Sequence, residues 1–330
     1  MSDHTKIEWA DATVNAVNGC TVLSPGCTNC YAMRSGGRNL PGHPSTGLTK
    51  PTKAGHVWTG EVRLNETQLL RPLRWKRPRR IFWNAHGDLF HQAVPDAWID
   101  RVFAVCALTP HHQHLILTKR SARMREYFAD PESVRRIALA VLELDLAGAL
   151  AGRTQPPVFP LPNVWLGVSV EDQARADERI PDLLATPAAV RWLSCEPLLG
   201  PVDLHDSQCR ETGSSKDCPA CLGGLDWIVA GGESGPGARP MHPDWARSLR
   251  DQCASANVPF FFKQWGEWRG YDPSEDNFTE RDCTGEYGEK YRFHEFGDGR
   301  DPCAENLCIR IGKKRTGRLL DGIEHNGFPA

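Results

Sequence analysis

Three cysteines near the start of the chain have the spacing of metal ligands. Cys20, Cys27 and Cys30 form a C-x6-C-x2-C pattern, and the last two are spaced as a chelating pair. Ser24-Pro25-Gly26 predicts a turn that lets Cys20 join them. Three thiolates suit an iron–sulfur cubane in which one iron lacks a protein ligand, whereas structural zinc takes four ligands. Since the closest further ligand in sequence is only His43, the pattern favours an iron–sulfur cluster over zinc and over three ordinary loop cysteines.

A second group of cysteines lies in a polar segment at residues 205–224. Cys209, Cys218 and Cys221 give C-x8-C-x2-C, which predicts a small zinc site if one further ligand joins them. A second iron–sulfur cluster and a metal-free loop are the alternatives. The chain has 12 cysteines but no basic start followed by an apolar stretch. We therefore expect a cytoplasmic protein whose clustered thiols bind metal and do not pair as disulfides.

Short apolar runs alternate with helical patterns along the chain. The runs predict strands at Ile81–Asn84, His114–Thr118, Val164–Val170, Val190–Cys195, Asp226–Ala230 and Pro259–Lys263, with a further one near residues 7–17. Helices are predicted at Asp96–Leu108, from Asp130-Pro131-Glu132 to about Leu150, at Glu171–Ala185 and at Pro243–Asn257. This alternation indicates βαβ units and a mainly parallel sheet.

The order of these elements predicts an α/β fold that is a complete or partial β/α barrel. A doubly wound open sheet is the alternative. Residues 1–268 form the expected barrel domain, with the cysteine-bearing insertion at 205–224 inside it. Residues 269–330 are polar, glycine-rich and weakly periodic, and we expect a loop-rich C-terminal extension there. The length of 330 residues fits one large α/β domain or two smaller ones.

Polar or ionisable side chains follow each predicted strand. They are Asn84, His86, Asp88, Thr118, Lys119, Arg120, Ser169, Glu171, Asp172, Cys195, Glu196, Glu233, Ser234, Lys263 and Gln264. Because the carboxyl ends of the strands carry the active site of a β/α barrel, six such ends together predict a site. The glycine-rich segment Gly231–Gly237 either presents backbone N–H groups to a carboxylate or phosphate or is a plain turn.

Several blocks of the sequence resemble a known family. They are KIEWADATVNAVNGC, SPGCTNCYA, IFWNAHGDLFH, LILTKR, WLGVSVEDQ, RWLSCEPLLGP, DWIVAGGESGPGARPMHPDW and VPFFFKQWGEW, which cover most of residues 6–268. Through them the chain resembles an uncharacterised, largely phage-encoded family of radical-SAM-like three-cysteine-motif proteins. At a distance it is similar to spore photoproduct lyase, a radical SAM enzyme that repairs a DNA lesion. The usual radical SAM motif is C-x3-C-x2-C, so the six-residue first gap departs from it.

The resemblance implies a [4Fe-4S] cluster on Cys20, Cys27 and Cys30, with S-adenosyl-L-methionine (SAM) on the open iron. Reduction would cleave SAM to a 5′-deoxyadenosyl radical, which the protein would direct toward its target and shield from water. The resemblance also implies an electron donor and a phage-encoded partner protein.

Roles for the strand-end residues follow from the same resemblance. By position, Asn84 to Asp88 would clamp the SAM amino group. The further candidates for cofactor binding are Thr118, Ser169 and Glu171. The catalytic candidates are Cys195 and Glu196, of which Cys195 would return a hydrogen atom to a product radical, as in spore photoproduct lyase. A small buried hydrophobe is the alternative role for this thiol.

Basic residues are concentrated in short stretches, although the formal net charge is −2 and the pI about 6.6. Arg71–Arg80 holds six basic residues around Trp75. Arginine beside an aromatic ring suits phosphate contact and base stacking. The residues predicted to bind nucleic acid are Arg74, Lys76, Arg77, Arg79 and Arg80. Lys119–Arg125 and Lys313–Arg318 are further basic stretches, and a solvated face is the alternative for each.

Together these features predict a radical-SAM-type enzyme that acts on a nucleic acid base or nucleotide, in repair or in modification. The main alternative is a non-catalytic, zinc-stabilised nucleic-acid-binding protein. A metal-dependent hydrolase is a third interpretation, but the chain lacks an H-E-x-x-H signature. No apolar run is long enough to span a bilayer, so we expect no membrane association.

Overall fold

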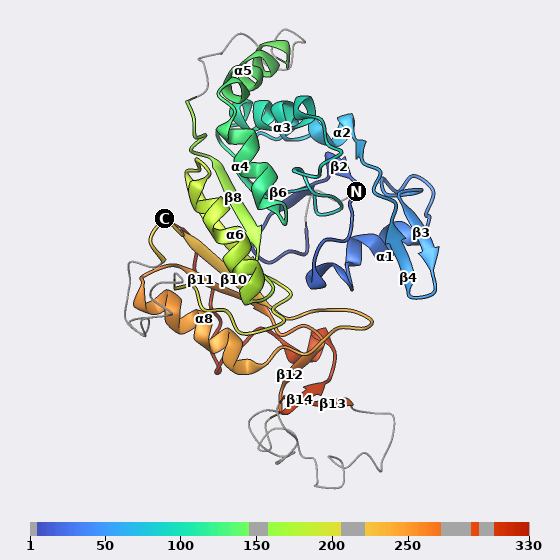
Figure 1. Ribbon diagram of the computed structural model, residues 1–330, viewed down its shortest axis with the longest axis vertical. Coiled ribbons are helices and arrows are strands. Elements are labelled where there is room, and N and C mark those ends of the chain that lie inside the picture. The colour runs from blue at the N-terminus through green and yellow to red at the C-terminus, as the bar shows by residue number, and fades with distance from the viewer. Residues whose placement is uncertain (1–4, 145–157, 206–221, 272–291, 297–306, 330) are drawn as a thin grey trace. The chain divides into compact units, whose positions relative to one another are not determined.

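A computed structural model describes residues 5–144, 158–205, 222–271, 292–296 and 307–329 (Figure 1). The contacts within the chain divide it into two compact units. Unit 1 comprises Met1–Ser169 and Asp177–Leu193, and unit 2 comprises Val170–Ala176 and Ser194–Ala330. The predicted second cysteine group, Cys209, Cys218 and Cys221, lies outside the described residues.

Seven strands form one sheet in the order β1-β6-β7-β8-β9-β10-β11. They are β1 (Ala12–Val14), β6 (Arg80–Trp83), β7 (Gln113–Thr118), β8 (Val164–Ser169), β9 (Val190–Cys195), β10 (Trp227–Gly231) and β11 (Phe260–Gln264). The pairs β1–β6, β6–β7, β7–β8 and β10–β11 are parallel. The strands are arranged in their chain order, without the reversal that marks a doubly wound sheet. The predicted α/β class is therefore confirmed, and the order is compatible with a partial β/α barrel.

Unit 1 holds the first four of these strands and a long connection between β1 and β6. The helices α3 (Asp96–Leu108), α4 (Ser121–Ala129) and α5 (Glu132–Leu144) belong to the crossovers around β7. The β1–β6 connection contains β2 (Val17–Asn18), η1 (Pro25–Cys27), α1 (Tyr31–Gly37), β3 (Thr49–Thr52), β4 (Gly55–Trp58), β5 (Arg63–Leu64), α2 (Glu66–Leu69) and η2 (Pro72–Arg74). β2 pairs with β5, and β3 pairs with β4, both antiparallel. All three cysteines of the first group lie in this connection.

Unit 2 contains β10, β11 and the helix between them, α8 (Pro243–Ser255). A three-stranded antiparallel sheet follows, made of β12 (Trp268–Gly270), β14 (Leu307–Arg310) and β13 (Arg292–Glu295), and α10 (Lys313–Thr316) comes after it. The described part of the expected loop-rich extension therefore includes regular structure. α6 (Gln173–Ala185) and β9 contribute residues to both units.

Local sequence explains where several of these elements begin and end. Every residue of β8 is buried, as expected for a parallel strand covered on both faces. α3 starts after Pro95 with Asp96 in its first turn, where a carboxylate is favourable. β6 ends one residue earlier than predicted because Asn84 has a φ of +60°, a left-handed conformation that asparagine tolerates.

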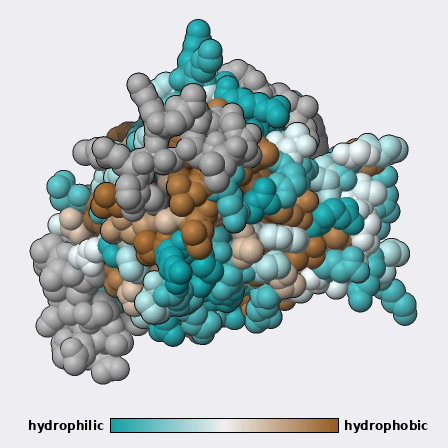
Figure 2. All heavy atoms as spheres, turned by 90° about the horizontal axis from the view of Figure 1, so that it is seen from above, coloured by the Kyte–Doolittle hydropathy of each residue, from teal (hydrophilic) through white to brown (hydrophobic). Residues whose placement is uncertain are grey.

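Burial also distinguishes the two faces of α5. Ile137, Val141 and Leu144 are buried, whereas Leu139 and Leu142 are 50% and 48% exposed. Figure 2 shows hydrophobic (brown) and hydrophilic (teal) residues side by side on the face seen from above. The helix predicted from Asp130 is present to Leu144, and its expected end near Leu150 lies outside the described residues.

Candidate metal centre

The chain enters the cysteine loop through a close approach of backbone segments. Gly19 has a φ of +97°, which favours glycine, and a Cβ there would lie 2.1 Å from the carbonyl oxygen of Glu61. The Gly19 N–H donates to the His86 carbonyl oxygen at 3.0 Å, and Gly19 forms a parallel bridge with Gly87. The residue before Cys20 is therefore fixed against the segment that follows β6.

A tight turn holds Cys27 and Cys30 near each other, as their spacing predicts. The Cys27 N–H donates to the Ser24 carbonyl oxygen at 2.9 Å, and the Cys30 N–H donates to the Cys27 carbonyl oxygen at 3.2 Å. Pro25 fills the first position of this 3-10 turn, and α1 begins directly after Cys30. The turn predicted at Ser24-Pro25-Gly26 is therefore present.

The three thiols share one partly buried environment. Cys20 and Cys30 pack against the buried side chains of Ala32, Met33, Leu48 and Trp58. The Cys27 thiol acts electrostatically on both Cys20 and Cys30. Burial raises the pKa of Cys20 to about 12, and it also raises the pKa of Cys30 against the opposing effect of nearby backbone N–H groups. Both thiols are therefore protonated at neutral pH unless a metal displaces the proton.

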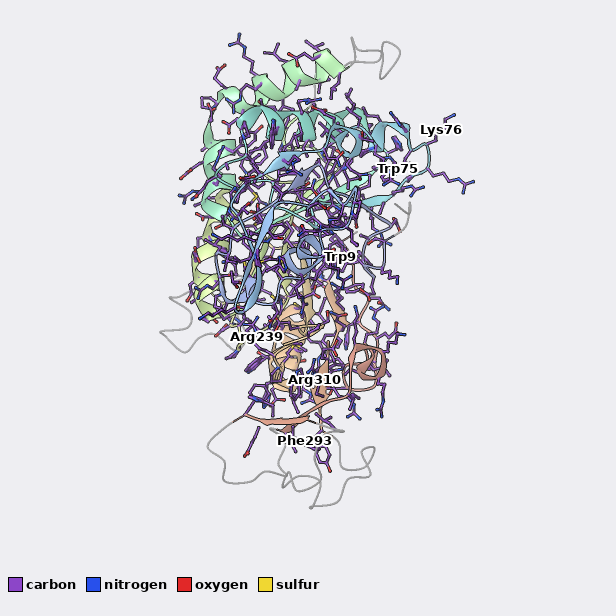
Figure 3. All side chains as sticks on the ribbon, turned by 90° about the vertical axis from the view of Figure 1, so that its right-hand side faces the viewer. Trp9, Trp75, Lys76, Arg239, Phe293 and Arg310 are labelled. Atoms are coloured by element: carbon purple, nitrogen blue, oxygen red, sulfur yellow. The ribbon has the colours of Figure 1, made fainter. Side chains whose placement is uncertain are left out.

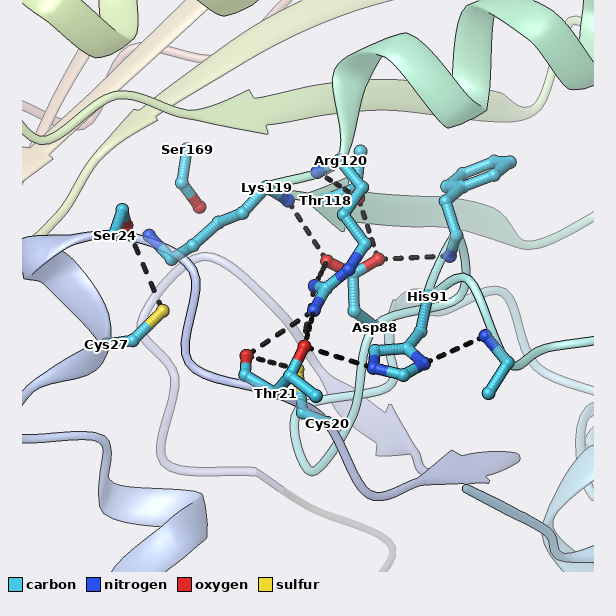
Figure 4. Close-up of polar contacts among 12 residues, drawn as sticks. Cys20, Thr21, Ser24, Cys27, Asp88, His91, Thr118, Lys119, Arg120 and Ser169 are labelled. Carbon is cyan, nitrogen blue, oxygen red and sulfur yellow. Dashed lines mark hydrogen bonds and ion pairs between the residues drawn. The ribbon is translucent and has the colours of Figure 1, made fainter. Parts of the chain in front are cut away.

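Asp88 organises the strand ends beside this loop (Figure 4). Its Oδ1 accepts hydrogen bonds from the Thr118 hydroxyl at 2.7 Å and the Phe90 N–H at 3.0 Å. Its Oδ2 accepts from the Lys119 N–H at 3.1 Å and from Arg120 Nη1 at 2.9 Å. Since both oxygens are occupied and the side chain is buried, Asp88 fixes the segment after β7.

Arg120 extends this network to the cysteine loop. Its Nη2 donates to the Thr21 hydroxyl at 2.7 Å, and its Nη1 lies 3.6 Å from Cys20 Sγ. His91 Nε2 also contacts the Thr21 hydroxyl, at 3.2 Å, while its Nδ1 accepts the Ala93 N–H. A buried cation is thus held between a carboxylate and a candidate ligand. Arg120 was predicted only as one of the polar residues at the strand ends, and Thr21 and His91 were not predicted, because their roles depend on contacts far apart in sequence.

The residues predicted to bind SAM differ in how many of their hydrogen-bonding groups are already engaged. Asp88 and Thr118 are already bonded to each other, and Thr118 also accepts the Arg120 N–H at 2.9 Å. Both oxygens of Asp88 already accept hydrogen bonds, so a SAM amino group would have to replace one of these donors, and the clamp stays a prediction. Ser169, at the end of β8, is buried, and its carbonyl oxygen accepts from Arg179 at 2.9 Å.

Asn84 keeps one group for a ligand. Its Oδ1 accepts the Val17 N–H at 2.8 Å, which ties β6 to β2. Its Nδ2 is buried and has no hydrogen-bond partner among the described residues. An unpaired buried N–H group is costly unless something occupies it. Because that group is a donor, Asn84 suits a ligand oxygen and not the amino group that its position predicts.

The three thiols are the candidate metal ligands of the loop, and among the described residues no fourth one joins them. Within the described ranges, no three His, Cys, Asp or Glu side chains are close enough to hold a single metal ion. His43, the nearest predicted further ligand, contacts Ser35 through Nε2 at 3.3 Å and accepts the Ser45 N–H through Nδ1 at 3.2 Å. Lys119 extends toward Ser24 and Cys27 in Figure 4 and favours the Cys30 thiolate.

In unit 2, the strand ends form a separate polar group. Lys263 Nζ lies 2.8 Å from each carboxylate oxygen of Glu196, and Gln264 Nε2 donates to Glu196 Oε1 at 3.3 Å. Gln264 Oε1 is buried without a partner among the described residues. The charge of Glu196 is therefore balanced by Lys263. The sequence identified Lys263 only as one of several polar residues at strand ends.

Cys195 lies inside unit 2 and not at its surface. The thiol is completely buried, and burial together with Cys253 and Glu171 raises its pKa. Glu171 is also completely buried, and its carbonyl oxygen accepts the Leu199 N–H at 2.7 Å. These surroundings match the alternative role of Cys195 as a small core residue.

The glycine-rich segment after β10, Gly231–Gly237, forms hydrogen bonds with side chains of unit 2. Glu233 accepts from the backbone N–H, Nε and Nη2 of Arg239 at 2.7–2.9 Å. The Gly235 N–H donates to Glu267 Oε1 at 2.9 Å. A carboxylate of unit 2 therefore occupies this turn, as one of the two predicted interpretations allows.

The basic stretches have different surroundings. In Lys119–Arg125, Arg120 pairs with Asp88, Arg123 with Asp96 and Arg125 with Asp182. In Arg71–Arg80, the exposed Arg74, Lys76 and Arg77 form no ion pair with any described residue. Lys76 extends away from the protein in Figure 3. The positive charge of Arg74, Lys76 and Arg77 is therefore not balanced by a described side chain. These residues lie before the start of β6, whereas the cysteine loop lies at its carboxyl end.

The comparisons with known proteins identify one family. The family described as Protein of unknown function (DUF5131) matches residues 4–329. The chain belongs to this family. No curated protein and no solved structure gave a match. The part of this DUF5131 protein that the structure describes contains no helix long and apolar enough to cross a membrane.

Proposed function

We propose that this DUF5131 protein is an iron–sulfur enzyme of the radical SAM type that acts on a nucleic acid base or nucleotide, in repair or modification. The observation that carries the proposal is the meeting of Cys20, Cys27 and Cys30 in one partly buried environment at the carboxyl ends of β6 and β7. That end of a parallel sheet is where β/α enzymes place their chemistry.

The donor set fits a cluster better than a single ion. The ligands of a cubane bind different irons, so their sulfurs need not converge on one point. Three thiols without a fourth ligand among the described residues would leave one iron of such a cluster open. Arg120 and Lys119 place positive charge beside the thiols, which favours the anionic form that binds metal.

Two side chains near the loop are available to bind SAM at the open iron. Asn84 would donate its buried, unpaired Nδ2 to a SAM oxygen, and Ser169 would offer its hydroxyl. When bound and reduced by the electron donor, the cluster would pass one electron to SAM, which would divide into methionine and a 5′-deoxyadenosyl radical that abstracts hydrogen. The chain itself holds the ligands, buries them and keeps Asp88 and Arg120 paired beside them. An electron donor and a partner protein belong to the same proposal.

Metal content and SAM cleavage test this function. The protein is purified without oxygen, iron, sulfide and zinc are measured, and reductant and SAM are added. We expect about four irons per chain and formation of 5′-deoxyadenosine. Cys27→Ala should lose both. Cys106→Ala, which removes a thiol buried in α3, should keep both. A colourless protein that carries only zinc, or equal iron in Cys27→Ala and wild type, would refute the proposal.

The predicted hydrogen donor is tested separately. Cys195→Ala should leave iron content and SAM cleavage unchanged, because this thiol lies within unit 2 and is buried with Cys253. An altered product would support a catalytic thiol. An unchanged product, together with a lower free energy of unfolding, would assign Cys195 to packing.

A further inference from the structure

A hollow in unit 1 lies at the amino ends of the strands, away from the cysteine loop. Its volume is about 660 Å³. Residues that precede or begin β1, β6, β7 and β8 line it, among them Asp11, Arg79, Arg80, His111, Gln113 and Asn163. Pockets of about 300–1,000 Å³ accept small organic ligands. The hollow is therefore large enough for one nucleotide.

The walls of this pocket are fixed before any ligand binds. Asn163 Nδ2 donates to the carbonyl oxygens of Cys106, Thr109 and His112 at 3.0–3.2 Å. The Gln113 N–H donates to the Arg79 carbonyl oxygen at 2.9 Å. Little conformational entropy is then lost when the site is filled.

The charge at this site is positive. Asp11 lies 3.6 Å from Arg80 Nε and accepts its backbone N–H at 2.7 Å, so this pair is balanced. Arg79 stacks over Trp75 at 4.6 Å, and Arg71 approaches the same ring at 5.3 Å. Both guanidinium groups lie within cation–π distance of this ring, so positive charge is held at the edge of the pocket.

The buried imidazole next to the pocket also lacks a partner on one side. His112 is 1% exposed, its Nε2 contacts the Pro72 carbonyl oxygen at 3.3 Å, and its Nδ1 has no hydrogen-bond partner among the described residues. His111 Nε2 contacts the Trp75 carbonyl oxygen at 2.9 Å. The two histidines, which both line the pocket, therefore join it to the basic stretch.

We propose that this pocket and the exposed Arg74, Lys76 and Arg77 form a docking site for single-stranded nucleic acid. One nucleotide enters the pocket, and the adjacent phosphates contact the three exposed side chains. A single strand is favoured because a base must leave its stack to enter a pocket of this size. An acidic protein would use the exposed charges but would leave the pocket without a role. The site lies at the end of β6 opposite the cysteine loop, so it holds a strand and does not react with it. It goes beyond the proposed chemistry and does not require it.

Binding of a fluorescein-labelled DNA oligonucleotide, measured by anisotropy without SAM, tests the exposed side chains. Arg74→Ala/Lys76→Ala/Arg77→Ala should weaken binding at least tenfold. It should also reduce the slope of log K against log salt by about 2, at about 0.7 per phosphate contact for a single strand. The control Lys6→Ala/Lys50→Ala/Lys53→Ala removes as many exposed charges of unit 1 and should change little. Equal weakening by both triple variants would overturn the site.

A second variant tests the pocket. Gln113 is exposed and its backbone bond to Arg79 does not involve its side chain, so Gln113→Trp should fold and fill the hollow. It should lower single-strand affinity to that of the matching duplex while keeping the salt slope. Unchanged affinity, or displacement of the strand by polyglutamate of equal charge, would contradict a nucleotide pocket. Cluster-free Cys27→Ala protein should bind as tightly as wild type, so failure here is distinct from failure of the proposed chemistry.

Discussion

The side chains of Asp88 and Arg120 are each only 8% exposed, and they form the most buried ion pair beside the cysteine loop. A buried pair is not in itself a large source of stability, because both charges lose their hydration. Loss of one partner is costly, however, because the remaining charge would be buried without water or a counter-charge. The pair therefore favours one arrangement of Thr21 and Cys20 over others.

Arg120→Leu should lower the free energy of unfolding by about 3–5 kcal/mol, because it leaves Asp88 without its cation. Asp88→Asn/Arg120→Leu should cost less than the sum of the single changes, as urea unfolding would measure. The control is Arg135→Leu, whose pair with Glu132 is 74% and 59% exposed, and it should cost less than about 1 kcal/mol. Additive single and double changes would contradict coupling.

His114 carries a pH dependence of a different kind. Trp83 Nε1 donates to its Nδ1 at 3.0 Å, and its Nε2 contacts the Thr109 hydroxyl at 3.0 Å. Because that hydroxyl donates to the Val105 carbonyl oxygen, the proton of the imidazole is assigned to Nε2. Burial lowers the pKa of His114 to about 3, with His112 adding to the effect.

The unfolded chain takes up this proton near pH 6.5 and the folded chain does not. The contribution of His114 to stability is therefore complete above about pH 6.5 and is lost as the pH falls toward 3. From pH 7 to 5 the loss should be about 2 kcal/mol. His114→Gln should remove that part of the decrease in urea unfolding. Parallel curves for variant and wild type would show that the imidazole does not titrate in this way.

At the scale of elements, β6 separates two sites. It has four residues, which span roughly 13 Å at about 3.3 Å per residue. The nucleotide pocket precedes it and the cysteine loop follows it. Gly19 and Gly87 then fix the loop against the end of this strand.

Gly19→Ala should displace the loop, because the added Cβ meets the Glu61 carbonyl oxygen at 2.1 Å. Iron per chain should fall to less than half. Gly47→Ala is the matched control, since Gly47 also has a positive φ, +80°, but nothing lies within 4 Å of the added Cβ. It should share the backbone strain and keep its iron. Equal iron in both variants would show that the contact with Glu61 does not position the cysteines.

Much of this framework follows from sequence. The apolar run of β8 and the Pro95–Asp96 start of α3 are strong local signals. α4 was missed, although Ser121, Met124 and Tyr127 recur every three residues on its buried face. The cysteines were found because ligand spacing is local, while the pairing of Asp88 with Arg120 joins residues 32 positions apart. Whether a polar side chain still has a free atom, as Asn84 does, is decided only by packing.

At the scale of the whole molecule, charge is local and not global. The net charge is −2 and the pI about 6.6, yet one short stretch has six basic residues. Screening over about 10 Å lets such a stretch act independently of the total.

Oligonucleotide affinity should therefore stay constant from pH 7 to 9, where the protein becomes more negative but its arginines keep their charge. Anisotropy titrations at constant ionic strength would measure it. A steady loss across that range would show that the total charge, and not the Arg74–Arg77 region, controls binding.

The position of the cysteine loop in the long connection between β1 and β6 also orders its assembly during translation. The thiols leave the ribosome before the segments that hold them, and Arg120 follows Cys30 by 90 residues (120 minus 30). At about 5–20 residues per second, that interval lasts roughly 5–18 s. Throughout that period Cys20 lacks Arg120, the cation that lies beside it in the folded chain. Under the proposed function, we therefore expect iron and sulfide to enter the loop late, once the nascent chain has passed β7.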